Sequence, residues 1–151
     1  MGDERINKPS DDFFMKMALK EAETAFQAEE VPVGAVVVFQ DRIIARAHNL
    51  SELLNDVTAH AEMQAITSAM NMLGAKYLIG CTVYVTVEPC IMCAGALGWS
   101  QISRIVYGAF DEKRGYSIFS PSPLHPKTEV TRGIMEKECS ELMSSSFKRK
   151  R

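Results

Sequence analysis

Hydrophobic residues recur along the chain with two different periods, which predict alternating helices and strands. Apolar side chains fall on one helical face from about residue 11 to residue 30, with Ser10 or Asp11 as the cap. Residues 33–39 and 43–48 are typical of two strands joined by a turn at 40–42, and a loop follows over 50–57. A second helix is predicted from about residue 59 to 73, with Thr58 as its cap and Gly74 at its end.

The second half of the chain continues this alternation. The pattern predicts a strand over 82–87, a helix over 90–99 with Pro89 in its first turn, and a strand over 104–107 closed by Gly108. A loop over 117–126, a short strand at Val130 and a last helix over 134–147 follow. Helices between strands imply parallel pairing and a sheet covered on both faces. We therefore expect a three-layer α/β/α domain whose mixed, largely parallel-edged sheet has about five strands.

Composition fits one globular domain over residues 1–151. Of the 151 residues, 46% are hydrophobic and 24% are charged, which argues against disorder and against a disulfide scaffold. We expect residues 1–10 to form a flexible arm and residues 134–151 to form a helix with a basic end. The longest apolar run, residues 90–99, is too short to span a membrane, and the first residues lack a secretory signal. The expected location is the cytoplasm.

Charge is distributed unevenly along the chain. The net charge is −2, but residues 1–103 carry 7 basic and 13 acidic side chains, whereas residues 104–151 carry 10 basic and 6 acidic ones. The chain ends in four consecutive cations, residues 148–151. Taken on charge alone, this end is either a contact for phosphates or a solvated tail.

Two short motifs carry the candidate chemistry: His60-Ala61-Glu62, and Cys90 with Cys93. Each motif opens a predicted helix, and cysteines three residues apart share one helical face. Helix N-termini favour thiolates, and zinc binds thiolates together with neutral imidazole. His60, Cys90 and Cys93 would leave a fourth position on zinc for water, and Glu62 would act on that water as a base. This requires His60 to lie at the very first turn, because residues two apart on an ideal helix point to nearly opposite sides.

Each of these features taken alone has a simpler interpretation. A Cys-x-x-Cys pair can be redox-active or accidental, a single histidine is more often a core residue, and a single glutamate is usually solvated. Cys81 and Cys139 are most simply small buried hydrophobes. Because both motifs open helices and complement one another, we favour a zinc site with one ion per chain.

The two motifs together resemble those of the zinc-dependent deaminases of the cytidine/deoxycytidylate deaminase superfamily. Longer stretches are similar to the bacterial tRNA-specific adenosine deaminases, and the similarity extends from about Phe13 to Arg151. The stretches are residues 30–36 (EVPVGAV), 58–62 (TAHAE), 88–96 (EPCIMCAGA), 106–109 (VYGA), 129–131 (EVT), 133–134 (GI) and 138–139 (EC).

This resemblance implies a function and a set of roles. Glu62 would take a proton from water and pass it to the purine and to the leaving ammonia, while water oxygen adds at C6 of adenine to give inosine. The implied substrate is the wobble adenosine of an arginine tRNA, presented in its anticodon stem-loop, and the implied assembly is a homodimer. Asn49, Ala61 through its backbone N–H, and Asp111 would contact the substrate. The RNA backbone would be bound by Lys113, Arg114, Lys148, Arg149, Lys150 and Arg151.

Some residues depart from the family pattern, and other functions remain open. Trp99, Phe110 and Tyr116 differ from the residues usual in the family and lie near the expected RNA-binding edge rather than the metal. A deaminase of a free base or nucleoside, such as guanine or cytidine, would share zinc and Glu62 without needing the basic tail. A non-catalytic zinc-binding module would not need Glu62, and a thiol–disulfide role would leave both His60 and Glu62 unused.

Overall fold

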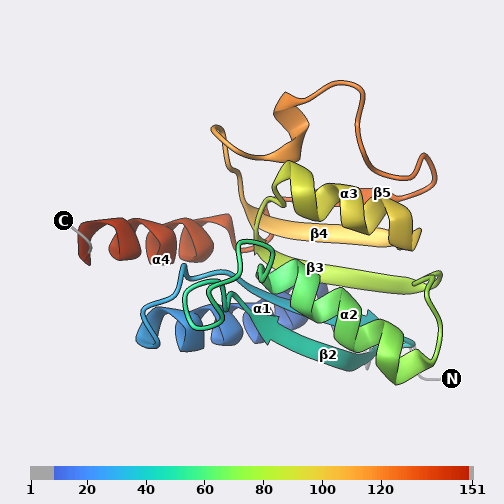
Figure 1. Ribbon diagram of the computed structural model, residues 1–151, viewed down its shortest axis with the longest axis horizontal. Helices are drawn as coiled ribbons and strands as arrows, with labels where there is room; N and C mark the ends of the chain where they lie inside the picture. The colour runs from blue at the N-terminus through green and yellow to red at the C-terminus, as the bar shows by residue number, and fades with distance from the viewer. Residues whose placement is uncertain (1–8, 150–151) are drawn as a thin grey trace, which may run out of the picture.

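A computed structural model describes residues 9–149 and shows one five-stranded sheet between two layers of helices (Figure 1). The strand order is β2-β1-β3-β4-β5; β1 pairs antiparallel with β2 and β3, whereas β3, β4 and β5 run parallel. The predicted fold class, a three-layer arrangement around a mixed sheet, is confirmed. In chain order the elements are α1 (Asp11–Gln27), β1 (Gly34–Phe39), β2 (Arg42–His48), α2 (Ala61–Leu73), β3 (Cys81–Val87), α3 (Ile91–Ser100), β4 (Arg104–Ala109), a one-turn 3-10 helix (Tyr116–Ile118), β5 (Glu129–Arg132) and α4 (Glu136–Arg149).

The sheet is buried on both faces, which explains why its central strands are almost continuously hydrophobic. Alternate side chains of a strand point to opposite faces, so neighbouring valines enter different cores. Val36 packs with Phe14 of α1 and Cys139 of α4, whereas Val37 packs with Ala65 of α2 and Leu97 of α3. None of the helices within residues 9–149 is long and apolar enough to cross a membrane.

The end of α1 and the cap of α2 differ from their predictions. Ser10 caps α1, as expected, by accepting a hydrogen bond from the Phe13 N–H at 3.1 Å. The helix ends at Gln27 rather than near residue 30, because the chain turns through a positive φ of 63° at Glu29. Thr58 does not cap α2; its N–H and hydroxyl donate to Asp56, and the capping position belongs to His60.

The second half shows smaller differences. Cys90 is the N-cap of α3, so Pro89 precedes the helix instead of lying in its first turn. Gly108 lies inside β4 rather than closing it, and a Cβ there would lie 2.6 Å from the Cys139 sulfur, so the glycine lets α4 pack closely on the strand. The last helix begins at Glu136, two residues later than predicted. Part of the expected arm, residues 1–8, and the last two cations, Lys150 and Arg151, lie outside the described residues.

Candidate metal centre and active-site pocket

The N-terminal ends of α2 and α3 bring the two sequence motifs together. His60 is the N-cap of α2, Cys90 is the N-cap of α3, and Cys93 lies in the first turn of α3. The His60 Nδ1 atom is 3.6 Å from the Cys90 sulfur and 3.5 Å from the Cys93 sulfur, and the three ligand atoms lie within 4.8 Å of one another. The predicted ligand trio is therefore assembled by the fold.

The spacing of these donors fits a tetrahedral zinc ion. Zn–S bonds of about 2.3 Å and Zn–N bonds of about 2.0–2.1 Å at tetrahedral angles place nitrogen and sulfur about 3.5 Å apart. The two nitrogen–sulfur distances, 3.6 and 3.5 Å, agree with that value. Two thiolates and one imidazole are ligands that zinc prefers, and three protein ligands leave one position open, as catalytic zinc sites do.

Hydrogen bonding changes the pKa values of the two cysteine thiols. The hydrogen bond from Cys93 lowers the pKa of Cys90 to about 4, and the same contact is the largest cause that raises the pKa of Cys93. A thiol whose pKa is lowered in this way ionises readily, and the thiolate is the form that binds a metal cation. The N-terminal end of α3 adds a favourable partial charge for the thiolates.

Glu62 is the buried carboxyl group of the site. It lies in the first turn of α2, and loss of solvent on burial raises the pKa of Glu62 to about 7. A carboxyl group with this pKa can both accept and release a proton near neutral pH. His60 has extended backbone angles, φ −72° and ψ 158°, so the opposite-sides geometry of an ideal helix does not apply. Both residues line one cavity, as the zinc hypothesis requires.

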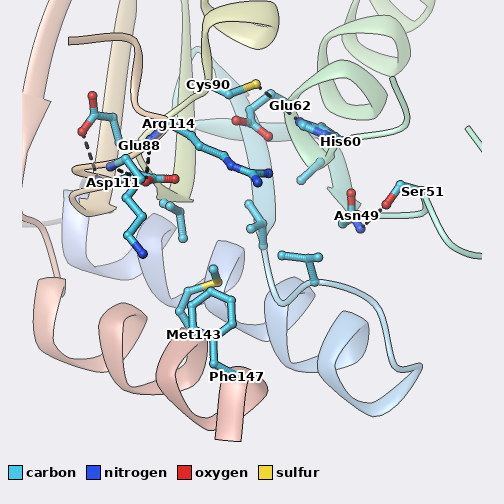
Figure 2. A pocket seen from close by; sticks show the side chains of 15 residues that line it. Asn49, Ser51, His60, Glu62, Glu88, Cys90, Asp111, Arg114, Met143 and Phe147 are labelled. Carbon is cyan, nitrogen blue, oxygen red and sulfur yellow. Dashed lines mark hydrogen bonds between the residues drawn. The ribbon is translucent and has the colours of Figure 1, made fainter. Parts of the chain in front are cut away.

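This cavity has a volume of about 420 Å³, and two of the three ligand residues, His60 and Cys90, line it. Figure 2 shows His60, Glu62 and Cys90 on one wall, with Met143 and Phe147 on the opposite wall. Asn49 lies at one end of the cavity and Asp111 at the other. Of the residues predicted from sequence, the cavity brings together Asn49, His60, Ala61, Glu62, Cys90, Asp111, Lys113 and Arg114.

The predicted phosphate-binding cations of α4 lie outside the cavity lining. Neither Lys148 nor Arg149 lines the cavity, although both directly follow Phe147, which does. The Arg149 guanidinium lies 3.8 Å from the centre of the Phe26 ring and so helps to hold the end of α4 against α1.

Met143 and Phe147 are pocket residues that the sequence reasoning missed. They are four residues apart, so they share one face of α4, a helix that is otherwise largely polar. Phe147 remains 61% exposed, which leaves its ring available at the mouth of the cavity. An apolar pair at this spacing was the available signal, but it equally predicts a packing face.

Glu88 was also missed, and it holds the loop at the Asp111 end. Its buried carboxylate accepts hydrogen bonds from the Asp111 N–H at 3.2 Å, the Ser117 N–H at 3.0 Å and the Ser117 hydroxyl at 2.6 Å. Asp111 Oδ1 in turn accepts hydrogen bonds from the N–H groups of Lys113 and Arg114. One carboxylate oxygen of Asp111, a residue predicted to contact the substrate, therefore stabilises the loop to which Asp111 belongs. Ala61 also lines the cavity, and its N–H, the first of α2, has no partner within the helix.

Comparison with known proteins gives one consistent result. The sequence profile described as "Cytidine and deoxycytidylate deaminase zinc-binding region" matches residues 8–109. The chain is 46% identical to the tRNA-specific adenosine deaminase of Aquifex aeolicus (strain VF5), covering 93% of this chain and 95% of the relative. It is 45% identical to the tRNA-specific adenosine deaminase of Bacillus subtilis (strain 168), with coverages of 91% and 89%.

Solved structures agree with this assignment. A structure from a study of A-to-I editing by tRNA:A34 deaminases superposes with a TM-score of 0.81 at 44% identity, covering 85% of this chain and 97% of that one. The guanine deaminase of Nitrosomonas europaea superposes with a TM-score of 0.77 at 22% identity, covering 91% and 84%. At that identity the second likeness shows a shared fold alone.

Proposed function

This chain belongs to the zinc-binding cytidine and deoxycytidylate deaminase family and, within it, to the tRNA-specific adenosine deaminases, and on that premise we propose that it deaminates adenosine in a tRNA anticodon loop. The proposed substrate is the wobble adenosine of an arginine tRNA, and the product is inosine. The observation that carries the proposal is the buried carboxyl group of Glu62 beside a His-Cys-Cys trio, at a cavity that Glu62, His60 and Cys90 line.

The proposed chemistry divides between the metal site and Glu62. His60 Nδ1 and the sulfurs of Cys90 and Cys93 would hold one Zn²⁺ per chain, and zinc bound there would supply Lewis acidity toward a water molecule. Glu62 accepts a proton from that water at a carboxylate oxygen and delivers it to the purine ring. The water oxygen adds at C6, and Glu62 then takes the remaining proton of that oxygen and gives it to the 6-amino group. The C6–N6 bond breaks, ammonia leaves, and the oxygen becomes the C6 carbonyl of inosine.

A charge-removing substitution tests the role of Glu62. Glu62→Gln keeps the size of the side chain but removes the base, so turnover should fall by about 10²–10⁴-fold while the zinc content stays at one ion per chain. Glu23→Gln makes the same change on the exposed face of α1 and should leave both quantities unchanged. Full turnover by the Glu62→Gln variant would contradict the proposed proton transfer.

We propose that one rim of the cavity binds the anticodon stem-loop. Asn49, the Ala61 N–H and Asp111 would contact the target nucleotide, because they surround the space next to the metal trio. Lys113 and Arg114 line the cavity, and Lys148, Arg149, Lys150 and Arg151 follow Phe147 along the chain. These cations would bind backbone phosphates.

Salt dependence separates phosphate binding from a solvated tail. Deleting residues 148–151 should weaken RNA binding, and the slope of log affinity against log salt should decrease by about 0.7 for each phosphate that the tail no longer neutralises. The metal content should not change. Unchanged affinity and unchanged slope would show that the tail binds no phosphate.

The outer side of α3 supports the proposed homodimer. Trp99 is 85% exposed, and Ile91 is also exposed two turns earlier on the same helix. Exposed apolar groups of this size favour burial against another protein surface. Trp99→Arg should therefore shift the sedimentation coefficient from a dimer to a monomer, whereas a wild-type protein that is already monomeric would contradict the proposal. The cytoplasm is the proposed location, because that is where the proposed substrate is found.

A further inference from the structure

Glu30 is the most completely buried carboxylate beside the pocket, and it does not itself line the cavity. It is 2% exposed and lies between the end of α1 and the start of β1. The Glu30 N–H donates to the Ala25 carbonyl at 2.9 Å, which fixes the backbone from which the side chain projects inward. The position of this carboxylate is therefore set by the turn that ends α1.

Three N–H groups donate to the Glu30 carboxylate. Oε1 accepts from Asn49 Nδ2 at 3.1 Å and from the Glu52 N–H at 2.9 Å, and Oε2 accepts from the Leu53 N–H at 2.8 Å. All three partners are donors, as an ionised carboxylate requires. Glu30 thus links the loop after β2 to the end of α1. It also contacts Asn49, the residue predicted to bind the substrate, directly.

These contacts determine which way the Asn49 amide faces. A carboxylate can only accept, so the amide atom beside Glu30 must be the nitrogen; a flipped amide would place two oxygens against each other. The second hydrogen of this nitrogen goes to Ser51 Oγ at 2.9 Å, on the side of the amide that Figure 2 shows turned toward Ser51. Both N–H groups of the amide are thereby used.

Only the carbonyl oxygen of Asn49 is left for a ligand. The side chain is 4% exposed and lines the cavity beside His60 and Ala61. An amide with free N–H groups would favour the ring nitrogens of a purine, which only accept. An amide whose N–H groups are both engaged favours a group that donates.

We propose that Glu30 is a positioning residue that holds the Asn49 carbonyl oxygen toward the cavity, so that this end of the site recognises a hydrogen-bond donor on the target nucleotide. The inference rests on the proposed function for the identity of that nucleotide. In an adenosine within RNA, the donors near the reacting ring are the 6-amino group and the ribose 2′-hydroxyl. The shared chemistry is an N–H or O–H group directed at Asn49 Oδ1.

Substrate substitutions combined with protein substitutions test this recognition. The substrates are an anticodon stem-loop RNA with adenosine at the target position, the same RNA with 2′-deoxyadenosine there, and the same RNA with 6-chloropurine riboside there. The deoxy substrate lacks the hydroxyl donor, and the chloro substrate lacks the amino donor and loses chloride instead of ammonia. Differences in intrinsic reactivity cancel when each decrease in kcat/KM is compared between enzymes.

Wild-type protein should lose about tenfold in kcat/KM on the substrate that lacks the recognised donor, the usual value of one hydrogen bond. Asn49→Ala removes the acceptor, and Glu30→Gln introduces an N–H that permits the amide to flip. In both variants the same substrate change should lower kcat/KM by less than about twofold. Glu29→Gln makes the same chemical change at the exposed neighbour and should keep the wild-type decrease.

The alternative outcome is equally definite. If Glu30 merely supports the fold, Glu30→Gln lowers kcat/KM by the same factor on all three substrates, and the proposal is overturned. Decreases on both modified substrates that are identical in wild type, Asn49→Ala and Glu30→Gln overturn it as well. Zinc content and thermal unfolding of each variant show that the comparison is made between folded proteins.

A measurement without turnover decides the orientation independently. The side-chain amide signal of Asn49 in ¹⁵N-labelled protein is identified by its disappearance in Asn49→Ala. Its protons should exchange with water at least tenfold more slowly than those of an exposed asparagine, and Glu30→Gln should abolish this protection. Unprotected protons in the wild type overturn the proposal. If the wild type forms no inosine, the proposed function fails while this measurement still decides the role of Glu30.

Discussion

A partly buried ion pair joins the first turn of α1 to three strands of the sheet and gives a quantitative prediction for stability. Asp11 Oδ1 accepts hydrogen bonds from the Tyr84 hydroxyl at 2.7 Å and from Arg104 Nη1 at 2.9 Å, and Oδ2 accepts from Arg104 Nη2 at 2.7 Å. Arg104 also donates to Thr131 Oγ1 on β5 at 2.9 Å. The bidentate geometry fixes both side chains.

Asp11→Asn keeps the shape of the side chain but removes its charge and one acceptor. Hydrogen bonds to a charged group contribute about 1.5–3 kcal/mol each, but the two side chains are 32% and 28% exposed, so solvent screening reduces this value. We expect the free energy of unfolding to fall by about 1–2 kcal/mol, and Tm to fall by about 2–8 °C in a domain of this size.

Asp12→Asn is the matched control for this substitution. Asp12 is the exposed neighbour in the same first turn, so it has a similar interaction with the helix dipole but lacks the contacts to Arg104 and Tyr84. Its effect should stay below about 1 kcal/mol. Urea titrations followed by circular dichroism, at one protein concentration, measure both variants.

The pH dependence gives the sign of the effect. The hydrogen bond from Arg104 holds the pKa of Asp11 below its ordinary value of 3.8. The pair therefore stabilises the folded chain fully above about pH 4, and this stabilisation is lost as pH falls through the lowered pKa. The difference between wild type and Asp11→Asn should be constant from pH 7 to 5 and shrink toward pH 3. Equal stabilities of Asp11→Asn and Asp12→Asn at pH 7, or a difference from wild type that grows in acid, would refute this reasoning.

Three further predictions concern the pocket loop, the core and the metal. A Cβ at Gly115 would overlap the Glu88 carboxyl group and lie 2.5 Å from the Asp111 carbonyl oxygen, so Gly115→Ala should shift the loop and lower kcat/KM by about 100-fold with zinc content unchanged. Wild-type kcat/KM in that variant would contradict the close fit. Leu97 is fully buried, so Leu97→Ala should lower the free energy of unfolding by about 2–5 kcal/mol in a denaturant titration, and a smaller decrease would contradict its place in the core. Removing zinc with a chelator should lower Tm, and adding zinc should restore it; an unchanged Tm would contradict binding at the His-Cys-Cys trio.

Local patterns were sufficient to predict most elements of the fold. Apolar residues at helical spacing predicted α1 and α2, and β-branched runs bounded by turns predicted β1 and β3. The hairpin turn was predictable because Gln40 and Asp41 separate two such runs, and both adopt a positive φ in the structure. These patterns depend only on residues that are neighbours in sequence, so they can be recognised without knowledge of the fold.

Features that depend on distant parts of the chain were not predictable. Asp11 and Arg104 are 93 residues apart, and no local pattern pairs them. Glu30 and Glu88 resemble ordinary solvated glutamates in the sequence, but packing buries both and surrounds them with backbone donors. The contribution of α4 to the pocket depends on how that helix lies against α1 and β4, which its own sequence does not specify.

The candidate site was more predictable than the contacts that support it. The metal-site residues lie in short motifs at helix N-termini, and such motifs can be recognised in the sequence. Two cysteines combined with one histidine favour metal binding. The cap of α2 was wrong because Thr58 has the better capping chemistry, yet His60 occupies that position and directs its ring to the sulfurs. The His60 side chain makes no capping hydrogen bond to α2.

Inosine formation in an RNA substrate is the decisive measurement for the proposed deaminase activity. Zinc-loaded protein is incubated with an arginine tRNA anticodon stem-loop that carries a wobble adenosine, and in parallel with free adenosine, cytidine and guanine. We expect inosine in the RNA at the wobble position and no turnover of the free compounds. Turnover of a free base or nucleoside without inosine in the RNA, or no turnover of any substrate by zinc-loaded protein, would contradict this expectation.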